Sequence, residues 1–312
     1  MKVCLVTSKG DYRIAGTGKG KFAIRLADAL MKMGVEITSD INEKSDIALH
    51  FGKMLCTSNA TKQIVRMGPA HVDTNQDYKK LNKRKAEAIR KADGVVYQSQ
   101  FSKRMCDKFL GEAKCPTAVI FNGADPEFYE KLEPAESPFK YNFLAATRKW
   151  IPQKRLKYTV AAFDLANIPD SCLWIAGDAK KKYESDNVRY LGLLNDKELG
   201  RYYRLCNALI HMVYLDACPN VVAEALVAGC KVMINAGCGT QELSPYFGDT
   251  PIRDREWDGK PVNLKKPPKV DVVKLATGFP IFAKPFTPED PTHLYISNIA
   301  QQYKDFFESC LK

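Results

Sequence analysis

The chain has 312 residues, 45% of them hydrophobic, and a formal net charge of +11. The length suits two α/β domains better than one, and the apolar content excludes an extended disordered chain. No apolar run approaches the roughly 20 residues of a membrane-spanning helix, and the first residues lack the apolar segment of a signal peptide. We therefore expect a cytoplasmic protein without a transmembrane segment.

The ten cysteines do not indicate a disulfide framework. They form no C-x-x-C pair, and several lie within or beside apolar runs, which is typical of buried free thiols in a reducing compartment. The four histidines are scattered along the chain, so no Cys or His cluster predicts a metal site.

Apolar runs and helical patterns alternate from the first residues onward. Residues 2–8 predict a buried strand, and the apolar positions of 22–33 recur at helical spacing before Gly34 ends the helix. Such alternation predicts a parallel sheet covered on both faces. In this half we also predict a helix at 78–92 and strands at 46–52, 63–67, 94–99 and 117–121.

The alternation resumes after 132–140, which carries two prolines and no apolar periodicity and is interpreted as a linker. Segment 251–291 is rich in proline and is predicted to be irregular. Residues 293–312 form an amphipathic pattern that predicts a closing helix. In this half we predict strands at 141–147, 172–177, 188–192, 208–213 and 231–236 and helices at 155–166, 196–205 and from Asn220.

These patterns predict an α/β protein of two doubly wound, Rossmann-like domains with a cleft between them. The first domain is expected at 1–135 and the second at 141–292, and helix 293–312 is expected to pack back on the first. In such sheets, ligands bind beyond the carboxyl ends of the strands.

A glycine-rich turn follows the first predicted strand. Gly16 and Gly18 form a G-x-G turn in which backbone amides can approach an anion at the start of a helix. Gly20-Lys21 is followed by Phe22, so a P-loop is not completed. The third glycine of a dinucleotide fingerprint is also replaced, by Lys21, which leaves a nicotinamide-dependent oxidoreductase as the weakest alternative.

The stretch YLDACPNVVAEALVAG, 214–229, leads from a polar loop into a helix of small residues. The first amides of such a helix lack partners and carry the positive end of its dipole, which favours a diphosphate. Glu224, one turn inside, suits a ribose diol, and Asp216 in the loop suits the hydroxyls of a second sugar. The alternative is a helix whose acids only complement its dipole.

The segment TRKWIPQK places Arg148 and Lys154 just after the first strand of the second predicted domain. Two cations at the carboxyl end of a strand suit the neutralisation of a diphosphate leaving group. The alternative is an ordinary basic surface loop.

Taken in order, these motifs resemble those of the retaining, family-four glycosyltransferases, which have the two-domain GT-B fold. DACPNVVAEALVAG is similar to the family's acid–seven–acid motif, and TRKWIPQK to its Arg/Lys pair. FNGADPEFY (121–129) resembles N-G-V-D-x-x-x-F, with Ala124 at the Val position, and GCGTQE (237–242) resembles G-G-T-x-E, with Cys238 at a Gly position. VVYQSQFSK (95–103) and WIAGD match further segments of the family.

The resemblance implies a nucleotide-sugar donor, UDP-, GDP- or ADP-linked, held by the second domain, and an acceptor held by the first. The transfer would be retaining and metal-independent, would need no cofactor, and fits the lack of a D-x-D motif. Arg148, Lys154 and Asp216 would carry the catalytic roles, and Glu224 would hold the ribose. Further donor contacts are implied for Asn220, Val221, Val222, Gly16 and Gly18.

The acceptor has no readable signature, so a glycan, lipid, protein or nucleic acid all fit. His71 in RMGPAHVD is an acceptor-side candidate or else an ordinary half-buried histidine, and His211 is predicted to lie in the core. Residues 79–108 carry ten basic and three acidic side chains, which suit contact with an anionic membrane surface or another polyanion. The rival function is a non-catalytic protein that keeps the fold and binds nucleic acid or anionic lipid, and a solvated basic helix face is the plainest reading.

Overall fold

The computed structural model describes residues 1–7, 10–13, 18–54, 56–244, 253, 256–285 and 290–312. The chain divides into two compact units. Unit 1 comprises Met1–Ala124 together with Thr292–Lys312, and unit 2 comprises Asp125–Pro291. The predicted linker therefore lies inside unit 2, and so does helix α4 (Pro126–Glu130) before it.

Unit 1 is built on a parallel six-stranded sheet in the order β2-β1-β3-β4-β5-β6. The chain adds β2 on one side of β1 and then crosses to add β3 on the other, so the strand order reverses between β1 and β3. The edge strand β2, only three residues long, is the one strand here without a predicted counterpart. The strands are β1 (Lys2–Val6), β2 (Glu36–Thr38), β3 (Ser45–Phe51), β4 (Ala60–Met67), β5 (Gly94–Tyr97) and β6 (Thr117–Val119).

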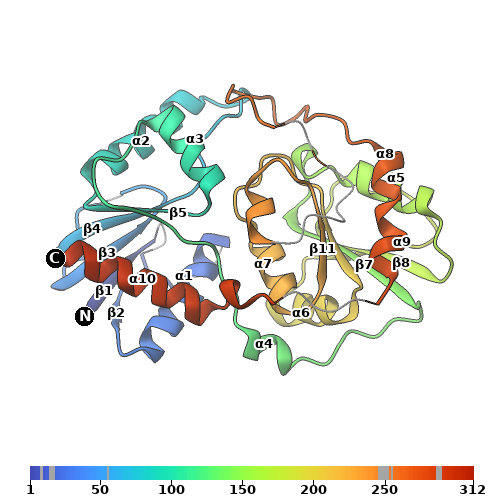
Figure 1. Cartoon of the computed structure of the whole chain (residues 1–312), viewed down its shortest axis with the longest axis horizontal. Coiled ribbons are helices and arrows are strands. Elements are labelled where there is room, and N and C mark those ends of the chain that lie inside the picture. The colour runs from blue at the N-terminus through green and yellow to red at the C-terminus, as the bar shows by residue number, and fades with distance from the viewer. Residues whose placement is uncertain (8–9, 14–17, 55, 245–252, 254–255, 286–289) are drawn as a thin grey trace. The chain divides into compact units, whose positions relative to one another are not determined.

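Helices cover both faces of this sheet. Figure 1 shows α1 (Gly18–Lys32) and α10 (Ile296–Leu311) on one side, and α2 (Tyr78–Lys91) and α3 (Gln100–Leu110) on the other. Apolar side chains of α1 and α10 pack against alternate residues of the strands in one continuous core. The closing helix is thus part of unit 1, and a short turn, η3 (Thr292–Leu294), leads into it.

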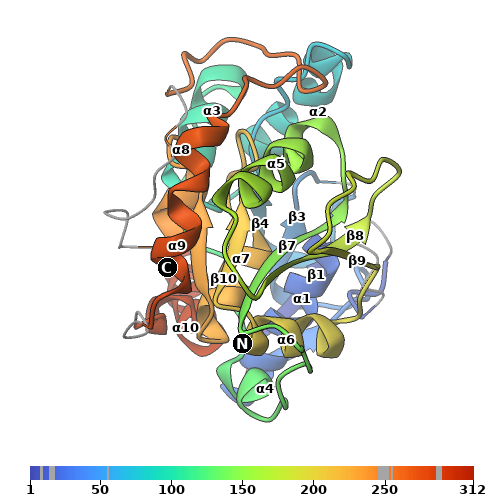
Figure 2. The same cartoon turned by 90° about the vertical axis from the view of Figure 1, so that its right-hand side faces the viewer.

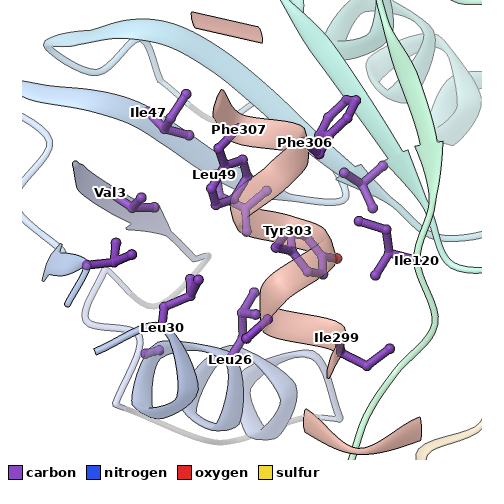
Figure 3. Packing of buried hydrophobic residues seen from close by; sticks show 14 of the residues in the cluster. Val3, Leu26, Leu30, Ile47, Leu49, Ile120, Ile299, Tyr303, Phe306 and Phe307 are labelled. Atoms are coloured by element: carbon purple, nitrogen blue, oxygen red, sulfur yellow. The ribbon is translucent and has the colours of Figure 1, made fainter. Parts of the chain in front are cut away.

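Helix α10 is anchored in this core by Tyr303. Figure 3 shows Tyr303 and Phe307 directed toward residues of α1 and the strands, and both side chains are fully buried. The hydroxyl of Tyr303 accepts a hydrogen bond of 3.0 Å from Nε of Arg66, a buried residue of β4. The same guanidinium donates to Asn122 and lies 4.1 Å from the ring centre of Phe22. A buried cation thereby connects β4, α1 and the last helix.

The anchoring role predicts the effect of Tyr303→Phe. Because the change leaves a buried guanidinium N–H without its acceptor, the free energy of unfolding should fall by about 1–3 kcal/mol. Urea denaturation would measure it, with Gln302→Ala on the exposed side of α10 as the control, expected within about 0.5 kcal/mol of the parent. Equal stability of the two variants would contradict the anchoring role.

Unit 2 is built on a parallel five-stranded sheet in the order β11-β10-β7-β8-β9. Here the strand order reverses between β7 and β10, because β8 and β9 follow on one side of β7 and β10 and β11 on the other. All five strands agree with the predicted runs to within a few residues. The strands are β7 (Tyr141–Lys149), β8 (Ser171–Asp178), β9 (Val188–Gly192), β10 (Ala208–His211) and β11 (Lys231–Ile234).

Segment 251–291 is not irregular throughout, contrary to the prediction. It contains two short helices, α8 (Val272–Ala276) and α9 (Gly278–Ala283), which lie with α5 (Leu156–Ala166) on one face of the sheet (Figure 2). Phe279 packs edge-to-face against Phe143 of β7, with ring centres 5.0 Å apart. Helices of five and six residues are too short to show a helical period, so the prolines dominated the prediction.

The other face of the second sheet carries α6 (Asp196–Leu205) and α7 (Asn220–Val227) (Figure 1). Both were predicted, and α6 begins with a capping box in which the side chain of Asn195 accepts from the amide of Glu198, at 2.9 Å. Two single turns, η1 (Pro152–Lys154) and η2 (Gly239–Leu243), follow β7 and β11. Among the residues described, no helix has both the length and the apolarity needed to cross a bilayer.

Candidate functional site

The carboxyl edge of the second sheet gathers the candidate donor residues. Arg148 lies at the end of β7 and is exposed, and Asp216 lies in the loop after β10. Since β7 and β10 are the neighbours between which the strand order reverses, both loops leave the sheet at its topological switch point. This is where open α/β sheets bind ligands.

Lys154 and Asp216 are in direct contact within this edge. Nζ of Lys154 lies 3.6 Å from Oδ2 of Asp216, and each side chain is about 21% exposed. Nε2 of His211, at the end of β10, lies 3.3 Å from the same oxygen. A carboxylate only accepts hydrogen bonds, so the imidazole carries a proton on Nε2. His211 is 3% exposed, as expected for a core residue, but its ring reaches the candidate site.

The charge state of this cluster follows from its surroundings. Burial opposes ionisation of Asp216, but the charge of Lys154 and the hydrogen bond from His211 outweigh it and hold the pKa of Asp216 below its usual range. Burial lowers the pKa of His211, which the carboxylate only partly offsets. At neutral pH Asp216 is therefore an anion and His211 is neutral.

Two hydrogen bonds join the loop after β7 to the loop after β10. The amide of Tyr214 donates to the carbonyl of Gln153, at 3.1 Å, and Nε2 of Gln153 donates to the carbonyl of Tyr214, at 2.7 Å. Leu215, the next residue, has a φ of 54°, a left-handed conformation that costs a non-glycine residue about 1–2 kcal/mol. The paired bonds hold the chain in this turn, and the turn places Asp216 beside Lys154.

Arg155 reinforces the same junction. Its φ is 60°, and its guanidinium is buried, where Nη2 donates to the carbonyl of Pro268 at 2.9 Å. The guanidinium carbon lies 5.0 Å from the ring centre of Tyr214, which suits a cation–π contact. Sequence reasoning gave Arg155 no role beyond the start of the predicted helix 155–166, but it is a buried support of the site.

Helix α7 carries the other predicted donor residues. It begins at Asn220, and its N-cap residue is Pro219, which provides no side-chain oxygen to cap the first turn. Asn220, Val221 and Val222 form that turn, in which the amide of Val222 donates to the carbonyl of Pro219, at 3.2 Å. Glu224 is half-buried, and its Oε2 accepts a hydrogen bond of 3.2 Å from the hydroxyl of Tyr203 on α6.

The loop after β11 packs closely against the loop that carries Asp216. A Cβ atom at Gly239 would lie 2.0 Å from the carbonyl oxygen of Ala217, so no larger residue fits there. Oε1 of Gln241 accepts a hydrogen bond of 2.9 Å from the amide of Gly237. Cys238 is buried, which raises its pKa to about 11 and keeps it a thiol. The GCGTQE segment thus shapes one wall of the candidate site.

Two of the predicted residues in unit 1 are described. Gly16 lies outside the described residues, whereas Gly18 is the exposed first residue of α1. His71 follows β4, and its backbone is held by Asn82 of α2, which accepts from its amide and donates to its carbonyl, both at 2.8 Å. Burial and the charges of Lys85 and Lys19 lower the pKa of the half-buried His71 ring to about 4.

The structure thus brings Lys154 and Asp216 together and places Asn220–Val222 and Glu224 on one helix. The side chain of Arg148 forms no hydrogen bond or ion pair with a described residue. Sequence reasoning missed Tyr203, which supports Glu224 across two helices and has no signal in its own segment. No group of three or more His, Cys, Asp or Glu side chains in the described ranges is arranged to hold a metal ion.

Comparison with solved structures identifies the fold. The sucrose-phosphate synthase of Thermosynechococcus elongatus matches with a TM-score of 0.69 and 14% identity, over 99% of this chain and 98% of that one. Anabaena HepE, solved in complex with UDP-glucose, gives 0.61 and 14% over 99% and 100%. AviGT4, a glycosyltransferase of avilamycin A biosynthesis, gives 0.62 and 17% over 99% and 98%.

No protein-family model and no curated protein sequence matches the chain. The structural matches cover nearly all of both chains, so this protein shares the α/β fold of these glycosyltransferases, with two Rossmann-like units, which is the fold class named GT-B. This confirms the fold class predicted from the sequence motifs. The assigned roles of the individual site residues stay predictions.

The contact between Lys154 and Asp216 is testable by a double-mutant cycle. Lys154→Met and Asp216→Asn, alone and together, should give a coupling of about 1 kcal/mol in the free energy of unfolding. Because the folded-state pKa of Asp216 is depressed, the coupling should be fully present above about pH 4 and be lost as the pH falls further. Pairing Asp216→Asn with exposed Lys157→Met is the control, expected to be additive.

Proposed function

We propose that the protein is a glycosyltransferase that moves a sugar from a nucleotide-diphosphate sugar to an acceptor, with unit 2 holding the donor. The observation that carries the proposal is the switch point of the second sheet. There, a lysine–aspartate pair, an exposed arginine and the start of a helix lie on adjoining loops. The fold shared with sugar-transferring enzymes, one of them solved with UDP-glucose, supports it.

In this proposal the diphosphate binds where positive charge converges. Arg148 is exposed at the end of β7, so its guanidinium is available to an incoming phosphate. Lys154 supplies a second cation, and the start of α7 supplies the positive end of the helix dipole. These groups stabilise the charge that develops on the β-phosphate as the bond to the sugar breaks, which is the main demand of this reaction.

Two carboxylates flank the diphosphate. Glu224 accepts from the ribose hydroxyls, and the hydrogen bond from Tyr203 fixes its orientation. Asp216 accepts from hydroxyls of the transferred sugar, and its depressed pKa keeps it ionised at every working pH. In this arrangement Lys154 lies between the transferred sugar and the diphosphate, because it contacts Asp216 on the sugar side.

The transfer we propose is retaining and metal-independent. The acceptor oxygen forms its bond to the anomeric carbon on the face from which the diphosphate leaves, and its proton passes to the departing phosphate oxygen. Atoms and charge then balance without a protein nucleophile, a metal or another cofactor. The donor is a UDP-, GDP- or ADP-sugar, and UDP is the first candidate because HepE was solved with UDP-glucose.

The rival function, a non-catalytic protein that binds nucleic acid or anionic lipid, draws on α2. Its lysines and arginines at 79, 80, 83, 84, 90 and 91 are exposed. A surface of this kind also suits an enzyme that works beside an anionic membrane, so it does not distinguish the two. Donor hydrolysis does, because a binding protein without a transfer site consumes no nucleotide sugar.

Glu224→Ala is the sharpest test of the donor site. The loss of a carboxylate that accepts from two hydroxyls should weaken nucleotide-sugar binding by about 1.5–3 kcal/mol, roughly 10–100-fold. Isothermal titration with UDP-glucose, GDP-glucose and ADP-glucose would identify the nucleotide and measure the loss. Exposed Glu184→Ala in the same unit is the matched control and should bind as the parent does.

Tyr203→Phe distinguishes the orientation of the Glu224 carboxylate from its charge. It keeps the carboxylate of Glu224 but removes its hydrogen-bond donor, so nucleotide affinity should fall less than in Glu224→Ala. Unchanged affinity in Glu224→Ala would remove Glu224 from the site.

Stabilisation of the folded protein by a bound nucleotide gives an independent measurement of diphosphate binding. A nucleotide diphosphate present at about 100 times its dissociation constant should raise the free energy of unfolding by about 2.7 kcal/mol. Thermal denaturation with UDP, GDP and ADP, in the parent and in Arg148→Ala, would show it. An equal shift in both proteins would mean that Arg148 does not touch the diphosphate.

A further inference from the structure

Unit 1 carries an unexplained concentration of positive charge at the carboxyl edge of its sheet. Lys19 lies in the first turn of α1, Lys53 follows β3, and Arg66 and His71 lie at and after the end of β4. Lys85 of α2 reaches the same edge, where its Nζ donates to the carbonyl of Pro69 at 2.5 Å. Four elements thus direct basic side chains to one place.

These side chains are close enough to influence one another. The pKa of Lys19 is lowered by desolvation and by the charges of Arg66 and Lys53. Burial lowers the pKa of Lys85 to about 8, and the charge of Lys19 adds to the effect. Lys19 also lies directly over the backbone of Gly52, since a Cβ atom there would be 2.7 Å from its Nζ.

No carboxylate among the described residues forms an ion pair with these cations. Arg66 is 2% exposed and Lys85 is 8% exposed, and both are satisfied only by neutral groups. Burying cations without counter-charges is unfavourable, and folded proteins normally pair them. An anion that enters this edge would supply the missing charge.

The position of these basic side chains in the sheet and their exposure to solvent also suit a ligand-binding site. The strand order of this sheet reverses between β1 and β3, and Lys19 in the first turn of α1 and Lys53 in the loop after β3 follow these two strands at the switch point. Lys19 is exposed and Lys53 half-exposed, so both are open to a ligand from solution. Neither ring nitrogen of His71 bonds to a described residue, and the neutral ring can donate one hydrogen bond.

We propose that unit 1 holds a binding site for a phosphate monoester, with Lys19, Lys53 and His71 as its direct contacts. Buried Arg66 and Lys85 lie behind these contacts and add to the positive potential. A phosphate monoester fits best because it carries a charge of about −1.5 to −2 at pH 7 and three acceptor oxygens. In terms of the proposed function, on which this reading rests, the acceptor of the sugar is a phosphorylated molecule.

The site is tested first without any nucleotide sugar, so its failure is separate from a failure of the donor site. Glycerol 3-phosphate is the probe, titrated calorimetrically into the full chain in a buffer free of phosphate and sulfate, with glycerol as the neutral control. Lys19→Gln and Lys53→Gln should each weaken binding by about tenfold or more, the loss of one charge-assisted hydrogen bond.

Two control variants locate the anion. Lys83→Gln removes the same charge from an exposed position on α2 and should bind as the parent does, and so should Arg148→Ala in unit 2. The imidazole resonance of His71, assigned with His71→Gln, should shift during the titration. Absence of binding, equal weakening in Lys83→Gln, loss of binding in Arg148→Ala or an unmoved His71 signal would each overturn the proposal.

Vesicles distinguish a lipid-borne phosphate from a soluble one. Phosphatidic acid presents a phosphate monoester and phosphatidylglycerol a diester, so vesicles of equal charge isolate the monoester. Preferential sedimentation with phosphatidic acid that Lys19→Gln abolishes supports a lipid source. Binding of glycerol 3-phosphate without such a preference supports a soluble phosphorylated acceptor. Finally, Lys19→Gln should leave UDP-glucose affinity unchanged, and a parallel loss would overturn the separation of the two sites.

Discussion

The candidate donor site depends on the pair of hydrogen bonds by which Gln153 and Tyr214 join two loops. Neither loop is held in one conformation by its own residues alone. The pairing fixes both, and the left-handed turn at Leu215 then presents Asp216 to Lys154. Backbone strain at such a position is stable only where the surroundings over-determine it. Here a buried arginine and a close-packed glycine complete that support.

The two units differ in how the basic side chains at the carboxyl edge of each sheet are paired. In unit 2, Lys154 is matched by Asp216, so the edge of the sheet is nearly balanced before a ligand arrives. In unit 1, Lys19, Lys53 and Lys85 meet no such partner among the described residues. Where the positive charge is paired, a ligand is oriented mainly by hydrogen-bond geometry. Where it is unpaired, an anionic ligand is attracted mainly by charge. The overall charge of +11 reinforces the second effect.

Most of the fold was readable from the sequence because parallel strands buried on both faces form continuous apolar runs. Four exceptions, β2, α4, α8 and α9, have three to six residues and are too short to show a period. The eleven-residue helix α3 had no named counterpart either. The contact between Lys154 and Asp216 joins motifs 62 positions apart, and it was not predicted, because the sequence only assigned both residues to the donor site. Tyr203 and Arg155 had no signal, because each acts through a partner on another element. The predicted cleft stays a prediction.

The position of α10 affects how the chain acquires its structure. Unit 1 consists of the first 124 residues and the last 21, so unit 2 interrupts it along the chain. During synthesis, the leading segment exposes the apolar surface that α10 later covers until α10 has left the ribosome. Unit 2 is contiguous and can fold first. Folding of unit 1 is therefore completed only when α10 docks on the first segment, and termination of translation before α10 would release a product with an open hydrophobic face.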